Sequence, residues 1–60
     1  MEFNFDDIVV YKDVFGDEHR ARVLWKKGHD GLWVKSVDDK HRKAFTLNRA
    51  KVVRNEGRAK

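Results

Sequence analysis

The 60-residue sequence contains no cysteine and no proline. Without cysteine the chain can form neither a disulfide framework nor a cysteine-based zinc site, so its stability has to come from a packed apolar core. A chain of this length buries only about 60% of the surface that its unfolded form exposes, and we expect marginal stability. No apolar run reaches transmembrane length, and the N-terminal residues lack the features of a signal peptide. We therefore expect a cytoplasmic protein with no membrane partner.

The apolar residues that are present favour strands over helices, because most of them are β-branched or aromatic. No window repeats apolar residues at helical spacing beyond one repeat. The sequence thus predicts an all-β fold, with a core that comprises Ile8, Val10, Tyr11, Val23, Trp25, Leu32, Val34, Val37, Phe45, Leu47, Val52 and Val53.

Glycines and charged clusters divide the chain into five expected strands, at residues 8–12, 20–26, 32–37, 43–47 and 51–54. The first turn contains Gly16, which is free to adopt a positive φ. Residues 47–50 are too few for a helix and too polar for a strand, so a single 3₁₀ turn is expected there. Five short strands with a 3₁₀ turn before the last one predict a small five-stranded SH3-like barrel.

We expect this barrel to be one domain that spans residues 1–54. No repeat or low-complexity segment divides the chain further. Residues 55–60 carry no apolar side chain larger than that of Ala59, and they are predicted to be a disordered basic tail.

The charges are distributed unevenly along the chain. Residues 1–18 hold six acidic residues and one lysine, a balance of −5, whereas residues 19–60 hold thirteen basic and four acidic residues, a balance of +9; together they give the net charge of +4. Such asymmetry is typical of proteins that bind a polyanion. The alternative is a solvated surface whose two halves attract each other in the fold.

The order and spacing of several segments resemble the core of WYL domains. These segments are Ile8-x-x-Tyr11, Gly16, Arg22-Val23, Gly31-Leu-Trp-Val-Lys35 and Lys43-Ala-Phe-Thr-Leu-Asn-Arg-Ala50, and the resemblance covers roughly residues 8–53, most of the chain. The best match is Phe45-x-Leu47-Asn48-Arg49, where the family has Phe-x-Leu-Asp-Arg. The name-giving Trp-Tyr-Leu triplet reads Trp33-Val34-Lys35 here. The resemblance implies an SH3- or Sm-like barrel that senses a ligand, often a nucleic acid.

The polar residues form no catalytic or metal-binding motif. The three histidines are separated by 10 and 12 residues, which matches no local metal motif: they are His19, His29 and His41. Adjacent aspartates, as in Asp6-Asp7 and Asp38-Asp39, point to opposite sides of a strand and do not converge as a general acid and base. Ser36 is the only serine, and nothing in the sequence places a base beside it. We expect a protein that is not an enzyme, with no cofactor, metal or small-molecule substrate.

The two tryptophans are the remaining candidates for a site. Trp25 is in phase with Ala21 and Val23, which favours packing in the core. Trp33 is in phase with Lys35 beside a basic hairpin, so both burial and exposure remain open. An exposed aromatic ring flanked by cations binds single-stranded nucleic acid, because bases stack on the ring while the cations hold phosphates. We predict a small regulatory module that binds single-stranded DNA or RNA with weak sequence selectivity, through Trp33, Lys35, Lys40, Arg42, Lys43, Arg49, Lys51 and Arg54.

A protein-interaction module is the alternative. A small barrel with an acidic N-terminal third resembles accessory proteins by which phages or plasmids bind and modulate host enzymes. An acidic face could mimic nucleic acid or engage a basic host surface, with exposed aromatic residues adding apolar contact. The residues of this alternative are Phe3, Phe5, Asp13, Phe15, Asp17 and Glu18. The expected partner is therefore nucleic acid or a host protein.

Overall fold

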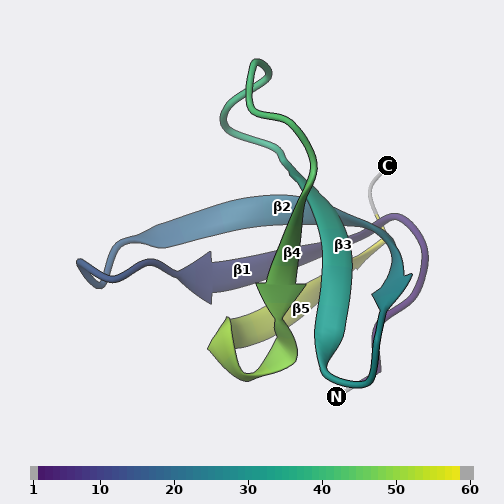
Figure 1. The fold of residues 1–60 in the computed structure, drawn as a ribbon. Helices are drawn as coiled ribbons and strands as arrows, with labels where there is room; N and C mark the ends of the chain where they lie inside the picture. Colours follow the sequence, from purple (N-terminus) through teal and green to yellow (C-terminus); the bar gives the residue numbers. More distant parts are fainter. Residues whose placement is uncertain (1, 59–60) are drawn as a thin grey trace.

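The computed structural model describes residues 2–58, which form five antiparallel strands and one 3₁₀ turn (Figure 1). The elements are β1 (Asp7–Lys12), β2 (Glu18–Lys27), β3 (Gly31–Ser36), β4 (Phe45–Asn48), η1 (Arg49–Lys51) and β5 (Val52–Arg58). The predicted all-β fold is confirmed, and so is the 3₁₀ turn before the last strand. Asn48 caps this turn, because its Oδ1 accepts a hydrogen bond from the Ala50 amide at 2.9 Å.

All five strands belong to one sheet in the order β4-β3-β2-β1-β5. Successive hairpins connect β1 to β2, β2 to β3 and β3 to β4. The turn η1 then redirects the chain so that β5 pairs with β1. In Figure 1, β3 and β4 cross in front of β1 and β5, so the sheet folds over itself around the core. Across residues 2–58, β4 and β5 are the edges of the sheet and do not pair with each other. The closure expected of a barrel is thus not observed.

Alternation along the strands gives the sheet a core-facing side and an outer face. On β3, Leu32 and Val34 are fully buried, whereas Trp33 and Lys35 are half-buried on the opposite side. The register pairs Lys35 with Arg22 and Arg22 with Ile8, so these residues share the outer face. The core cluster consists of Phe3, Val9, Tyr11, Ala21, Val23, Leu32, Val34 and Leu47, with Phe45 and Val52 packed against it.

The core prediction is wrong for Trp25, Val37 and Val53, which are 63%, 44% and 44% exposed. A β-bulge between Val23 and Trp25 explains the largest error, since two residues of β2 oppose Trp33 alone and Trp25 loses its phase with Val23. Val37 lies beyond the end of β3, and Val53 alternates with the half-buried Val52 on an edge strand. Ile8 and Val10 are half-buried and buried, but they lie on the outer face and not in the core cluster. The other predicted core residues belong to this cluster or pack against it.

Phe3 is part of the core, with only 4% of its surface exposed, so its predicted place on an exposed interaction surface is wrong. Hydrogen bonds hold the N-terminal segment against the sheet. The buried Asp7 carboxylate accepts from the Asn4 amide at 2.9 Å and from Asn55 Nδ2 at 2.9 Å, and Asn55 Nδ2 also donates to the Glu2 carbonyl. Phe5, by contrast, is half-exposed, and its ring centroid lies 6.5 Å from that of Trp25.

The predicted disordered tail is also corrected for residues 55–58, which belong to β5. Asn55 is the reason, because its side chain joins β5 to Asp7 and to the N-terminal segment. Its Oδ1 accepts a further hydrogen bond from the Gly57 amide at 2.8 Å. The rest of the predicted tail, residues 59 and 60, lies outside the described residues.

The β1–β2 loop, residues 13–17, is organised by Asp13 and Gly16. Asp13 Oδ1 accepts hydrogen bonds from the amides of Phe15 at 2.8 Å and Asp17 at 3.0 Å. Gly16 has a φ of 85°, as predicted. This positive φ closes the turn and leaves Val14 and Phe15 at its tip.

Candidate nucleic-acid interface

Trp33 lies on the outer face of β3. It alternates with the buried Leu32 and Val34, and its side chain is half-buried. The ammonium of Lys27 sits 4.4 Å from the centroid of the Trp33 ring, a cation–π contact. Trp33 is thus an outer-face residue and is no part of the core cluster.

A cleft with a basic rim lies next to Trp33 along the outer face. It has a volume of about 320 Å³ and is lined by Ile8, Arg22, Lys35, Ser36, Val37 and Lys40. Its apolar residues come from β1 and from the start of the β3–β4 loop, and its cations come from β2, β3 and that loop. We call it the basic cleft. With Trp33 and Lys27 it forms a track that runs along the outer face of β3.

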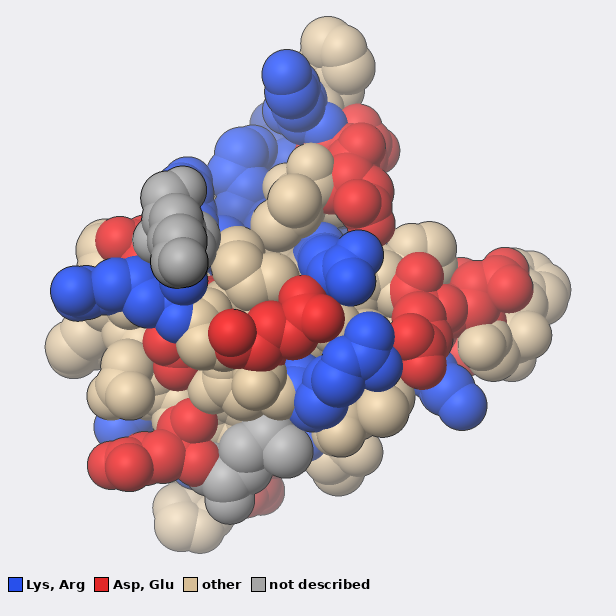
Figure 2. Space-filling model, turned by 180° about the vertical axis from the view of Figure 1, so that it is seen from behind, with Lys and Arg blue, Asp and Glu red and all other residues tan. Residues whose placement is uncertain are grey.

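The lysines of this track have no carboxylate partner. Of the ion pairs found within residues 2–58, none involves Lys27, Lys35 or Lys40, while Arg22 Nε lies 3.8 Å from Asp6 Oδ1. Lys35 Nζ instead donates a hydrogen bond to the Arg42 carbonyl at 2.9 Å, which fixes the β3–β4 loop over the end of β3. In Figure 2, basic and acidic side chains stand next to one another at the top of the view over this loop, and acidic side chains gather over the β1–β2 loop.

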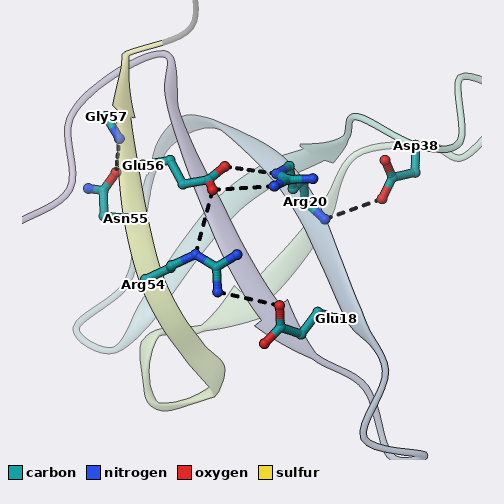
Figure 3. A network of polar contacts seen from close by, with 7 residues as sticks. All are labelled: Glu18, Arg20, Asp38, Arg54, Asn55, Glu56 and Gly57. Atoms are coloured by element: carbon teal, nitrogen blue, oxygen red, sulfur yellow. Dashed lines mark hydrogen bonds and ion pairs between the residues drawn. The ribbon is translucent and has the colours of Figure 1, made fainter.

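Arg54 lies in an ion-pair network instead (Figure 3). Its guanidinium contacts Glu18 at 3.4 Å and Glu56 at 3.5 Å, and Glu56 also pairs with Arg20 at 2.8 Å. The hydrogen bond from Arg20 lowers the pKa of the Glu56 carboxylate, so this acid stays charged. The register places Arg20 and Arg54 on either side of Val10. The charge of Arg54 is thus compensated within the protein.

The other predicted residues lie elsewhere. Arg42 stacks its guanidinium 3.9 Å from the centroid of the Phe45 ring. Arg42 and Lys51 both line a groove between the β1–β2 loop and η1. Arg49 lies 5.5 Å from the ring of Phe3, and its Nε is buried without a hydrogen-bond partner in the described part of the chain. Lys43 is exposed in the β3–β4 loop. The structure therefore brings Lys35 and Lys40 of the predicted set together beside Trp33, and it brings Arg42 and Lys51 together at a separate groove.

Two cations of the track, Arg22 and Lys27, are absent from the predicted set, as are the uncharged lining residues Ile8, Ser36 and Val37. Alternation along β2 places Arg22 on the polar side, but only the pairing with Lys35 joins it to the cleft. Lys27 stands in a predicted turn but is the last residue of β2, where it pairs with Gly31, and its ammonium reaches the ring of Trp33. Both positions depend on cross-strand register, which residue spacing does not reveal.

Asp13 and His19 form an acid–base pair, with 2.7 Å between Asp13 Oδ2 and His19 Nε2. The hydrogen bond with His19 lowers the pKa of Asp13. Because Asp13 also accepts two backbone amides, the pair organises the β1–β2 loop. In the described part of the chain no group of three or more His, Cys, Asp or Glu side chains is placed to hold a metal ion.

No protein-family model, curated protein or solved structure matches the chain. The resemblance to WYL domains therefore stays a prediction. No helix within residues 2–58 has the length and apolar character needed to cross a membrane.

Proposed function

We propose that this protein is a non-enzymatic regulatory module of the cytoplasm that binds single-stranded nucleic acid along the outer face of β3. One observation carries the proposal: Trp33 lies between Lys27 and Lys35 on that face, and neither lysine has an ion-pair partner in residues 2–58. An aromatic ring between uncompensated cations is the combination that single-stranded nucleic acid requires.

The track offers two kinds of contact. Phosphates would lie at the basic cleft, where Arg22, Lys35 and Lys40 converge. A base would stack on Trp33, and the ammonium of Lys27, now 4.4 Å from the ring centroid, would then move to a phosphate. Neither contact reads the edge of a base, so binding would be weakly sequence-selective and strongly dependent on salt.

The strand order supports a proposal for the fold as well. We propose that the sheet is an SH3-like barrel left open between β4 and β5. Supporting observations are the order β4-β3-β2-β1-β5, the 3₁₀ turn η1 between the two edge strands, and a core shared by β1 to β4.

Tryptophan fluorescence tests the function directly. In a Trp25→Phe variant, Trp33 is the only reporter, and the substitution affects a side chain that is mostly exposed. Titration with a single-stranded oligonucleotide should quench Trp33 at low salt, and the affinity should fall steeply as salt increases. Absence of binding at low salt would refute the proposal.

A further inference from the structure

The tip of the β1–β2 loop presents two apolar side chains to solvent. Val14 is 87% exposed and Phe15 is 85% exposed. The loop has a defined conformation, because the Asp13 amide donates to the Asp17 carbonyl at 3.0 Å and the Gly16 amide donates to the Asp13 carbonyl at 3.1 Å. A fixed, exposed phenylalanine is typical of a protein-contact surface.

A groove lies directly beside this loop. Two adjoining hollows of about 480 and 390 Å³ share the residues Lys12, Asp13, Val14 and Lys51. We call them together the loop groove. Its accessible apolar residues are Ala50, Val52 and Val53 in the smaller hollow, and Val14 at the loop tip forms part of the wall of both hollows. In the larger hollow, Tyr11 and Leu47 are almost fully buried.

The charges of the loop and of the groove are complementary. The groove carries Lys12, Arg42 and Lys51, and none of them takes part in an ion pair found within residues 2–58. The loop carries Asp17, an exposed carboxylate with no ion pair in the same set. An apolar tip with a free acid therefore adjoins a groove that carries free cations and, in its smaller hollow, accessible apolar side chains.

We propose that this surface binds a second copy of the chain, in a two-fold symmetric dimer. The β1–β2 loop of each copy would enter the loop groove of the other, with Phe15 against Val52 and Val53 of the smaller hollow and Asp17 near Lys51. Because tip and groove belong to one patch, a two-fold axis satisfies both at once and closes the assembly. A head-to-tail contact would instead leave one tip and one groove free.

The dimer is independent of the proposed nucleic-acid function. The loop groove shares no lining residue with the basic cleft, and neither Trp33 nor Lys27 lines it. Each dimer would therefore carry two tracks.

Sedimentation equilibrium over a range of protein concentrations tests the dimer. The wild-type protein should show a concentration-dependent monomer–dimer equilibrium. Phe15→Asp should raise the dissociation constant about tenfold or more, which is about 1.4 kcal/mol, because it removes the apolar anchor. Val37→Asp, which changes an exposed valine of the basic cleft, is the matched control and should leave association unchanged. A wild-type protein that stays monomeric, or a Phe15→Asp variant that associates as the wild type does, overturns the proposal.

Charge reversal tests the orientation. Asp17→Lys alone and Lys51→Glu alone should each weaken association, because like charges then face each other across the two-fold axis. Mixed in equal amounts, these two variants should form a heterodimer, since both contacts regain opposite charges in the mixed pair. Circular dichroism of each variant confirms that the fold is kept. If the mixture associates no better than the separate variants, the proposed orientation is wrong.

Discussion

Arg20 and Glu56 form a bidentate ion pair across strand β1, with 2.8 Å between Nε and Oε1 and 3.3 Å between Nη2 and Oε2. Since β1 lies between β2 and β5, this pair joins two strands that share no backbone hydrogen bonds. Beneath it, Val10 on the outer face is only 1% exposed. Charged side chains thus bury an apolar residue outside the core cluster.

This pair should make part of the stability dependent on pH. Glu56 has a lowered pKa in the folded state, mainly through its hydrogen bond from Arg20. Its contribution is therefore complete above the ordinary glutamate value of about 4.5 and is lost as the pH falls through the lowered pKa. Glu56→Gln should lower the unfolding temperature at neutral pH, and the difference from the wild type should shrink in acid.

Thermal unfolding followed by circular dichroism from about pH 7 to about pH 3 measures this difference. Glu2→Gln is a suitable control, because only the backbone carbonyl of Glu2 accepts a hydrogen bond from Asn55. A difference between Glu56→Gln and wild type that is equal at every pH would contradict the role of the charge.

Leu32 and Trp25 differ in burial, so replacing each with alanine should lower the unfolding free energy by different amounts. Leu32 is fully buried in the core cluster, so Leu32→Ala should cost about 2–5 kcal/mol of unfolding free energy. Trp25→Ala should cost less than half as much, since 63% of Trp25 is already exposed. Urea unfolding of both variants checks the ranking. Equal costs would mean that Trp25 packs in the core.

Gly31 should tolerate no side chain. A Cβ at this position would overlap with the carbonyl oxygen of Lys27 and would lie 3.2 Å from Thr46 Cγ2. Since the first contact is with the backbone of the β2–β3 hairpin, Gly31→Ala should cost about 1–3 kcal/mol. Urea unfolding measures the loss, and adding Thr46→Ser should not restore stability, because the backbone overlap remains. Recovery in the double variant would place the strain at Thr46 instead.

The local features of this fold could be predicted from the sequence because they depend on neighbouring residues. The alternation of Leu32 to Lys35, the positive φ of Gly16 and the 3₁₀ turn after Asn48 are of this kind. Trp25 could not be placed, because one bulge residue reverses the phase of everything after it. The strand at residues 55–58 could not be predicted either, because it depends on a hydrogen bond between Asn55 and Asp7, which are 48 positions apart in the sequence.

The same limit applies to the candidate site. Trp33, Lys35 and Lys40 are near one another in sequence, and the structure also places them on one track. Arg54 belongs to the same basic stretch, but its charge is compensated by Glu18, 36 positions away. Charge counted along the chain therefore overestimates the uncompensated basic surface.

The proposed interface predicts that position, and not net charge alone, determines the salt dependence of nucleic-acid binding. Lys27→Ala with Lys35→Ala removes two cations of the track, and Lys12→Ala with Lys51→Ala removes two cations of the loop groove. Both double variants lose the same charge. The first should flatten the plot of log affinity against log salt by about one to two units, because each phosphate contact on a single strand contributes about 0.7. The second should leave the slope near that of the wild type.

Trp33→Ala tests the stacking contact separately from the phosphate contacts, because stacking releases few counterions. It should weaken binding by about 1–3 kcal/mol and leave the salt slope nearly unchanged. Fluorescence anisotropy of a labelled single-stranded oligonucleotide measures affinity for every variant, and circular dichroism confirms that each one is folded. Equal slopes for the two double lysine variants would show that only net charge matters, and wild-type affinity in Trp33→Ala would remove the stacking contact. The first result would leave the outer face of β3 as an ordinary solvated surface, and the second would separate Trp33 from nucleic-acid binding.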